Sequence, residues 1–517
     1  MLPTDTATLT PERSSDAPTR EARGGRNTLA PQVFGDVARW DAPPTELLIG
    51  GRFVPASAGR TLAVEDPATG SPIAWVADAT TDDCLSALDA AADAQRGWTQ
   101  TAPRERARIL GRAAEALRAE VASLAYVVTT EMGKPLSESR AEVEFAADYL
   151  EWFAGEATRI AGRTSSSPDG AGRRLVTRAP VGPCLVIAPW NFPLAVPARA
   201  LGASLAAGCT VVLRPSSLTP LAPLMLARSL CEAGLPPGVL NVVVSSIDGA
   251  TDVLLSDGRV RKLSFTGSVS VGRALIARSA EQVVRTSMEL GGCAPFLVFS
   301  DVDLDAAVDG AFAAKMRNGG AACTAASRFL VQRGIFDEFA RRLAARIARV
   351  RIGPGTREGV GCGPMISARH VRRLADLVDD AVARGARVLV PGGPIPGAGY
   401  FFAPVVLSDV PLDAQVMREE IFGPVVAIAP FATEDEALDR ANDNPAGLAA
   451  YVYTSDLGRA MRVGEALNAG MIAVNCGRVS CASAPFGGVG HSGFGISGGL
   501  EGIDEYLVTR YVTMPLP

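Results

Sequence analysis

Histidine is scarce in this 517-residue sequence, which contains two, His370 and His491. A Ser-His-Asp triad or a histidine-rich metal site would have to use one of them, and we expect no metal centre. An excess of positive charge is also missing, because 50 Lys and Arg stand against 55 Asp and Glu, for a net charge of -5. The chain therefore offers no general basic surface, and we expect no nucleic-acid partner.

Paired cysteines and long apolar runs are missing too. The nine cysteines are scattered singly with no CxxC pair, which indicates reduced thiols and favours a cytoplasmic location. No run approaches the roughly 20 apolar residues of a membrane span, so we expect no membrane partner. Residues 1–44 are rich in Ser, Thr, Pro and Arg and predict a disordered tail; acidic residues near the start disfavour the alternative, a mitochondrial presequence.

What is present is the composition of a globular protein, with 48% hydrophobic and 20% charged residues and enough length for two or three domains. Apolar residues spaced by three and four between Ile109 and Val128 predict one long amphipathic helix. From Pro183 to Gly267, short β-branched runs alternate with helix-length segments. That rhythm predicts right-handed βαβ crossovers and a Rossmann-like parallel sheet, and a second alternation after Pro295 predicts a second α/β domain.

Two glycine-rich patterns near the C-terminus match known motifs by chance in our interpretation. Residues 488–493 fit GxGxxG and residues 495–499 fit GxSxG. Neither follows an apolar strand that would aim a phosphate loop or a strained serine, so we assign no function to them.

The informative motifs are short and lie far apart in the chain. They are Pro189-Trp190-Asn191-Phe192-Pro193, Phe265-Thr266-Gly267-Ser268, Glu289-Leu290-Gly291-Gly292, Asn318-Gly319-Gly320-Ala321-Ala322-Cys323, Glu420-Ile421-Phe422-Gly423-Pro424 and Pro485-Phe486-Gly487-Gly488. With this order and spacing, from about Leu47 to Tyr511, the chain resembles the aldehyde dehydrogenase family.

The resemblance implies an α/β fold with three parts. These are a Rossmann-like cofactor domain (45–159 and 182–290), an α/β catalytic domain (291–490) and a small β bridging element (160–181 and 491–517). The resemblance also implies a homodimer or homotetramer, in which the exposed edge of the final strand pairs with another subunit.

Three residues match the family's catalytic positions. A thiolate attacks an aldehyde well, and Cys323 matches the nucleophile. Asn191, with the backbone amide of Cys323, matches the donors to the developing oxyanion. Glu289 matches the base that activates water to hydrolyse the thioester. The structural alternatives are a buried cysteine, a turn or capping asparagine, and a salt-bridged or capping glutamate.

Cofactor positions are likewise implied by the resemblance, and the cofactor is NADP or NAD. The matching residues are Pro189, Trp190, Arg214, Ser217, Gly267, Ser268, Gly272, Leu290, Glu420 and Phe422. Two of them depart from the family pattern: Arg214 replaces a lysine, and Ser217 replaces the glutamate that NAD-preferring members use to bind the adenosine ribose. Both departures favour tolerance of NADP.

Within the family, the segments WNFPLAVPAR (190–199), RPSSLTP (214–220), AGLPPGVLNVV (233–243) and GIDEYLVTRY (502–511) resemble succinic semialdehyde dehydrogenases most. That resemblance implies that Arg199, Arg317 and Ser480 bind the substrate's distal carboxylate. Both arginines have alternatives, in a structural ion pair or a subunit contact. The expected partner is thus a small aldehyde, with another aromatic or biosynthetic aldehyde as an alternative. An inactive binding relative is a second alternative, suggested by Arg214, Ala321 and the replacement of Arg-Glu-Gly by residues 496–498. Ala325, two residues after Cys323, excludes a local disulfide.

Overall fold

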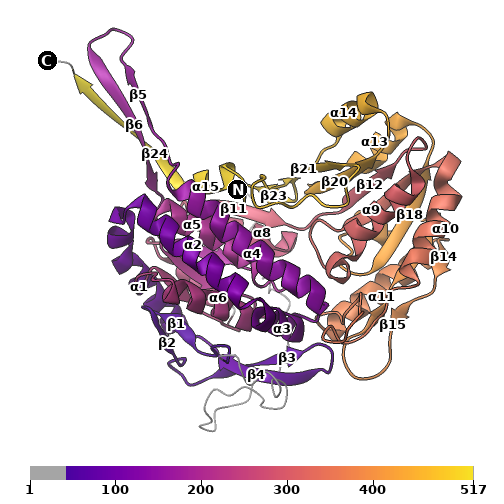
Figure 1. Ribbon diagram of the computed structural model, residues 1–517, viewed down its shortest axis with the longest axis horizontal. Coiled ribbons are helices and arrows are strands. Elements are labelled where there is room, and N and C mark those ends of the chain that lie inside the picture. The colour runs from indigo at the N-terminus through magenta and orange to yellow at the C-terminus, as the bar shows by residue number, and fades with distance from the viewer. Residues whose placement is uncertain (1–41, 248, 516–517) are drawn as a thin grey trace, which may run out of the picture.

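The computed structural model describes residues 42–247 and 249–515. The predicted tail, residues 1–44, therefore lies almost wholly outside the described residues. Figure 1 shows two α/β bodies side by side and a narrow β arm that projects from the first of them and carries the C-terminus.

The first body is built on an eight-stranded sheet with the order β2-β1-β9-β8-β7-β10-β11-β23. Its strands are β1 (Leu47–Ile49), β2 (Arg52–Val54), β7 (Cys184–Ile187), β8 (Val211–Arg214), β9 (Leu240–Val242), β10 (Lys262–Gly267), β11 (Arg285–Leu290) and β23 (Gly493–Phe494). The strands from β9 to β11 are parallel, and β7 pairs with both β8 and β10. This confirms the Rossmann-like unit, and the order reverses between β7 and β10, where a crevice opens at the carboxyl ends of the strands.

Helices cover this sheet and are buried on the sides that face it. They are α1 (Thr81–Gln100), α2 (Pro103–Ala119), α3 (Val121–Met132), α4 (Leu136–Ala157), α5 (Ala195–Ala207), α6 (Leu221–Glu232), α7 (Gly249–Ser256) and α8 (Val269–Ala280); the hairpin β3 (Thr61–Asp66) and β4 (Ser71–Ala77) adds to them. The prediction of one helix from Ile109 to Val128 is wrong, because Glu120 leaves the helical conformation (φ -102°, ψ 17°) between α2 and α3. Both termini of the predicted helix are still buried. The spacing of apolar residues identifies the buried face of a helix, but it does not reveal a one-residue break in the helical backbone.

The second body confirms the second α/β alternation. Its seven-stranded sheet has the order β14-β17-β18-β13-β12-β20-β21. The strands are β12 (Ala294–Val298), β13 (Ala326–Gln332), β14 (Arg387–Val390), β17 (Val405–Ser408), β18 (Val425–Phe431), β20 (Ala449–Tyr453) and β21 (Met471–Val474). The helices are α9 (Leu304–Met316), η1 (Arg317–Gly320), η2 (Arg333–Ile335), α10 (Phe336–Ile347), α11 (Ala368–Ala383), α12 (Gln415–Arg418), α13 (Glu434–Asn442) and α14 (Leu457–Ala466). Two small ladders join β15 (Gly393–Pro394) to β16 (Phe402–Ala403) and β19 (Ala446–Gly447) to β22 (Val489–Gly490).

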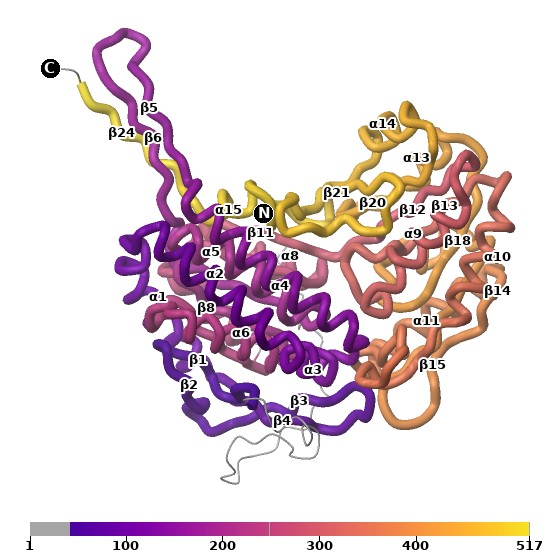
Figure 2. The backbone as a smooth tube through the Cα atoms, in the orientation of Figure 1, coloured from indigo at the N-terminus to yellow at the C-terminus, as the bar shows by residue number. Residues whose placement is uncertain are grey.

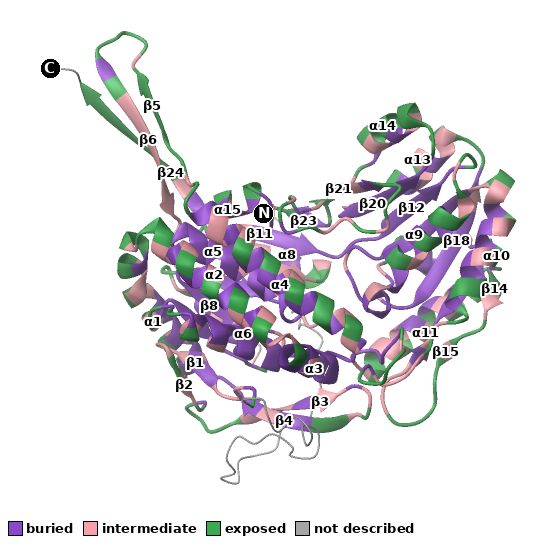
Figure 3. Cartoon of the chain, in the orientation of Figure 1, coloured by how far each residue is buried: buried purple, intermediate pink, exposed green. Residues whose placement is uncertain are grey.

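The β arm is a three-stranded antiparallel sheet with the order β24-β6-β5. It consists of β5 (Arg163–Ser166), β6 (Gly172–Pro180) and β24 (Leu507–Pro515), which follows the short helix α15 (Glu501–Asp504). Figure 2 traces the chain from the first body into the second and back. On that return β23 pairs with β11 before the chain reaches β24. The arm is largely exposed, whereas the two large sheets are buried (Figure 3).

Candidate active site

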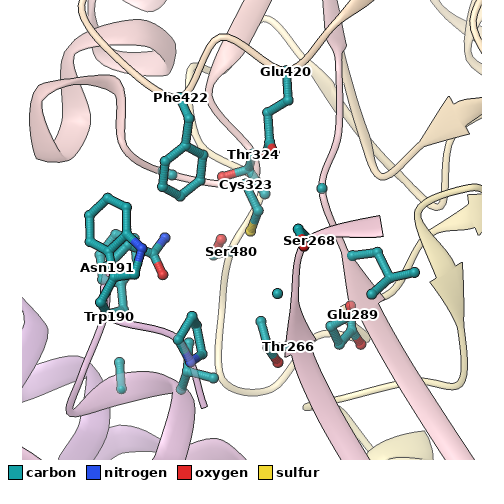
Figure 4. Close-up of a pocket in the computed structure, with 18 of the residues that line it drawn as sticks. Trp190, Asn191, Thr266, Ser268, Glu289, Cys323, Thr324, Glu420, Phe422 and Ser480 are labelled. Carbon is teal, nitrogen blue, oxygen red and sulfur yellow. The ribbon is translucent and has the colours of Figure 1, made fainter. Parts of the chain in front are cut away.

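A cavity of about 350 Å³ lies where the carboxyl ends of β7, β10 and β11 face the second body. Most of the predicted site residues line it, and Figure 4 shows Asn191, Cys323 and Phe422 among those that surround this space. Those that line it are Pro189, Trp190, Asn191, Arg199, Gly267, Ser268, Glu289, Leu290, Arg317, Cys323, Glu420, Phe422 and Ser480. The remaining three, Arg214, Ser217 and Gly272, lie outside the cavity lining.

Cys323 follows a tight loop that only small residues allow. Asn318, Gly319 and Gly320 all have left-handed φ values, of 54°, 58° and 81°. A Cβ at Gly320 would lie 2.3 Å from the carbonyl oxygen of Gly423, so the loop packs directly against the backbone of the second body. The half-buried thiol faces the cavity; its burial raises its pKa to about 12, against the lowering influence of Arg199. The resting group is therefore a neutral thiol.

Asn191 is held so that its side chain faces the same space as the thiol (Figure 4). Its Nδ2 donates one hydrogen bond to the carbonyl oxygen of Ala321, at 3.0 Å. Asn318 donates to that same carbonyl and to the carbonyl of Asn191, both at 2.9 Å. Position 321 thus contributes its backbone, so the departure to alanine there leaves these contacts intact.

A buried ion pair beneath Asn191 escaped the sequence prediction. Lys134 Nζ pairs with the Glu142 carboxylate and donates to the carbonyl oxygen of Asn191 at 2.7 Å. Glu142 also accepts hydrogen bonds from the backbone amides of Leu194 and Ala195 at the start of α5, at 2.9 and 3.1 Å. A buried pair of this kind is stable only when its remaining polar atoms are satisfied, as they are here. The sequence signal was weak, because Lys134 lies in the short link between α3 and α4 and its partner Glu142 lies within α4.

Glu289 ends β11 as a buried carboxylate. No ion pair involves it within the described residues, and the Ser497 side chain is the hydrogen-bonding group that acts on its pKa. Burial raises the pKa of Glu289 to about 7, against the opposing positive charge of Arg199. An unpaired carboxylate that titrates near neutrality has the properties of a general base.

Three arginines line the cavity, and two of them, Arg199 and Arg317, lie against aromatic rings. The Arg199 guanidinium carbon lies 4.2 Å from the centre of the Phe486 ring, and that of Arg317 lies 4.9 Å from the centre of the Phe192 ring. Throughout the described residues, neither arginine has a carboxylate within ion-pair distance. The predicted alternative of a structural ion pair for Arg317 is therefore not what the structure shows. Ser480 lines the same cavity.

The opposite wall fits a dinucleotide. The twelve-residue helix α8 begins there, with Ser268 as its N-cap, and Gly267 and Ser268 line the cavity, so the positive end of the helix faces it. A Cβ at Gly291 would lie 2.4 Å from Glu420 Oε2, so the Glu420 carboxylate packs directly against the Gly291 backbone. Burial raises the pKa of Glu420 to about 7.

The predicted residues outside the cavity lining lie on α8 and at the carboxyl end of β8. Gly272 on α8 lets the helix approach β11, because a Cβ there would lie 2.6 Å from the Leu290 side chain. Arg214 ends β8 and donates from Nη2 to the carbonyl oxygen of Ser245 at 3.1 Å. Ser217 is half-buried in the turn that follows. Among residues 42–247 and 249–515, no cluster of three or more His, Cys, Asp or Glu is placed to hold a metal ion.

Comparison with known proteins gives one consistent result. Residues 53–512 match the model of the aldehyde dehydrogenase family. The chain is 49% identical to a succinate-semialdehyde dehydrogenase of Paenarthrobacter nicotinovorans, over 86% of this chain and 99% of that protein. It is 42% identical to the NADP(+) succinate-semialdehyde dehydrogenase GabD of Escherichia coli K12, over 91% and 98%. The crystal structure of succinate-semialdehyde dehydrogenase from Burkholderia pseudomallei matches with a TM-score of 0.90 and 43% identity, over 92% and 98%.

Proposed function

This chain belongs to the aldehyde dehydrogenase family and is an NAD(P)-dependent enzyme, and from that premise we propose that it oxidises succinic semialdehyde to succinate. The observation that carries the substrate is the pair of cavity-lining guanidinium groups, Arg199 and Arg317, without a carboxylate partner within the described residues. A carboxylate at the far end of a short aldehyde supplies that partner. The test is the absorbance of the reduced nicotinamide with a panel of aldehydes and both cofactors.

The reaction we propose starts at Cys323. Its thiol gives up a proton to water as the sulfur bonds to the aldehyde carbon, and the carbonyl electron pair moves to oxygen, where the side-chain amide of Asn191 donates a hydrogen bond. Loss of a hydride from the bonded carbon re-forms the carbonyl and leaves a thioester on Cys323; a bound nicotinamide would supply the acceptor for that hydride. Glu289 then takes a proton from water as that water attacks the thioester, and the carbon–sulfur bond breaks to release the acid. Glu420 and Phe422 would hold the nicotinamide end of the cofactor, and Gly267 and Ser268 its pyrophosphate.

The assembly we propose is a homodimer or homotetramer. β24 is an edge of the arm, and its outer residues Tyr511, Val512 and Met514 are 58%, 46% and 45% exposed. An open strand edge with apolar side chains gains most by pairing with another subunit. We also place the enzyme in the cytoplasm, because all nine cysteines are free thiols. No described helix combines the length and apolarity that crossing a membrane requires.

Cofactor choice gives one prediction: the enzyme uses NADP at least as well as NAD. A glutamate at position 217 would repel the 2′-phosphate of NADP by roughly 4 kcal/mol at 4 Å with an effective dielectric of 20, before screening. The uncharged Ser217 avoids this repulsion. We expect Ser217→Glu to lower kcat/KM for NADP and to spare NAD. Leu218→Glu, which adds the same charge at an exposed neighbour, is the control. Wild-type kinetics that favour NAD a hundredfold would contradict this prediction.

The pKa of Glu289 gives a second prediction. Because burial raises it to about 7, the base is protonated and inactive below that pH, so kcat should rise as pH increases through about 7 where hydrolysis limits the rate. Steady-state rates from about pH 5.5 to about 8.5 measure this. Glu289→Gln removes the titrating group, and the residual rate should lose the inflection near 7; an unchanged inflection in that variant would assign it to another residue.

A further inference from the structure

His370 lines the cavity, and the mechanism above does not use it. It lies in the first turn of α11, where its backbone amide donates to the N-cap Ser367 Oγ at 3.2 Å. Its ring Nε2 lies 2.7 Å from the carbonyl oxygen of Phe422. A carbonyl only accepts, so Nε2 carries the hydrogen of this bond.

The residue that His370 contacts is strained. Phe422 has a φ of 58°, the left-handed region that an aromatic residue rarely adopts. Its ring meets Trp190 edge-on, with the ring centres 5.3 Å apart, and the His370 ring lies 5.9 Å from Trp190. All three rings line the cavity. A strained backbone persists only where its surroundings hold it, so the Phe422 ring depends on what fixes its carbonyl.

Arg373, one helical turn after His370, extends the same restraint. It donates to the carbonyl oxygens of Glu420 and Ile421, at 2.7 and 3.0 Å. Two side chains on one face of α11 thus hold three consecutive carbonyls, those of residues 420–422. Burial lowers the pKa of His370, which leaves the ring neutral near pH 7 with one nitrogen able to donate.

We infer that His370 is a positioning residue, whose Nε2–H fixes the left-handed backbone of Phe422 and so keeps the Phe422 ring against Trp190 at the nicotinamide end of the cavity. The inference rests on the proposed function for the role of Phe422. On this inference, α11 holds the cavity wall at residues 420–422 rigid. Loss of the His370 hydrogen bond should therefore weaken cofactor binding and leave aldehyde binding unchanged.

The test compares His370→Leu, which removes the donor, with His370→Gln, which retains an N–H of similar reach. In the protein without cofactor, hydrogen–deuterium exchange across residues 419–424 should be faster in the Leu variant and near wild type in the Gln variant. The cofactor KM should rise about 3- to 10-fold in the Leu variant, the fold-change of one net hydrogen bond. The aldehyde KM should stay within about twofold, which is below that change. His491→Leu, at the other histidine, which is exposed and contacts Arg273, is the matched control.

The outcomes test the role of His370 and the proposed function separately. Wild-type exchange and cofactor KM in the Leu variant would overturn the role of His370, and so would a Gln variant that behaves like the Leu variant. A similar increase in the cofactor KM and the aldehyde KM would assign His370 a role in general folding, and would also overturn its role as a positioning residue. A wild-type protein without NAD(P)-dependent oxidation in the aldehyde panel would refute the proposed function, while the exchange comparison would still measure the restraint on Phe422.

Discussion

Cys323→Ala should reduce aldehyde oxidation by at least about a thousandfold, because no other thiol among the described residues lines the cavity and a hydroxyl is a much weaker nucleophile. Cys323 is the only cysteine that lines this cavity among the described residues. Cys481→Ala is the matched control, since that thiol is exposed and follows the cavity residue Ser480. Near-full activity of the Cys323 variant would show that the mechanism is wrong.

Glu289→Gln separates the two halves of the same reaction. Glutamine keeps the shape of the side chain and cannot take a proton from water, so the hydride should still be transferred once while hydrolysis becomes about a hundredfold slower or more. Stopped-flow absorbance should then show a burst of about one reduced nicotinamide per active site, followed by a slow phase. A variant with both phases slowed equally would place Glu289 before hydride transfer.

The alternation of strands and helices was enough to predict both α/β bodies, because neighbouring parallel strands must be joined by crossover segments, which are usually helices, whatever the strand order. The break at Glu120 was not predictable from spacing, since the apolar face continues from α2 into α3. The strand order, and with it the crevice between β7 and β10, is a long-range property that local patterns do not contain.

The family motifs pointed to residues that line one cavity, and the structure shows what holds them there. The family resemblance singled out Asn191 and Cys323, and both line one cavity. Lys134 could not, because it acts on Asn191 across 57 positions of sequence. His370 has no motif either, since its contact with Phe422 depends on how α11 packs. Supporting residues of this kind are defined by distance in space, which sequence spacing does not report.

Substrate choice should depend on both arginines. The enzyme should strongly prefer succinic semialdehyde to butyraldehyde, an apolar aldehyde of the same length. Each charge-assisted hydrogen bond to the carboxylate contributes about 1.5 to 3 kcal/mol, or roughly 10- to 150-fold in kcat/KM. Butyraldehyde would instead leave both guanidinium groups desolvated and unpaired. The ratio of kcat/KM values should therefore collapse in Arg199→Ala and in Arg317→Ala, measured with both aldehydes.

The controls for this prediction separate recognition from folding and from general charge. Arg199→Lys keeps a positive charge beside Phe486 and should recover part of the ratio, without the two-pronged contact that a guanidinium makes. Arg478→Ala removes an exposed arginine that influences the pKa of Arg317 but does not line the cavity, and it should leave the ratio unchanged. If wild-type enzyme uses the two aldehydes equally, or if the alanine variants lose both substrates alike, the arginines do not recognise a carboxylate. The family chemistry at Cys323 would then serve a different aldehyde.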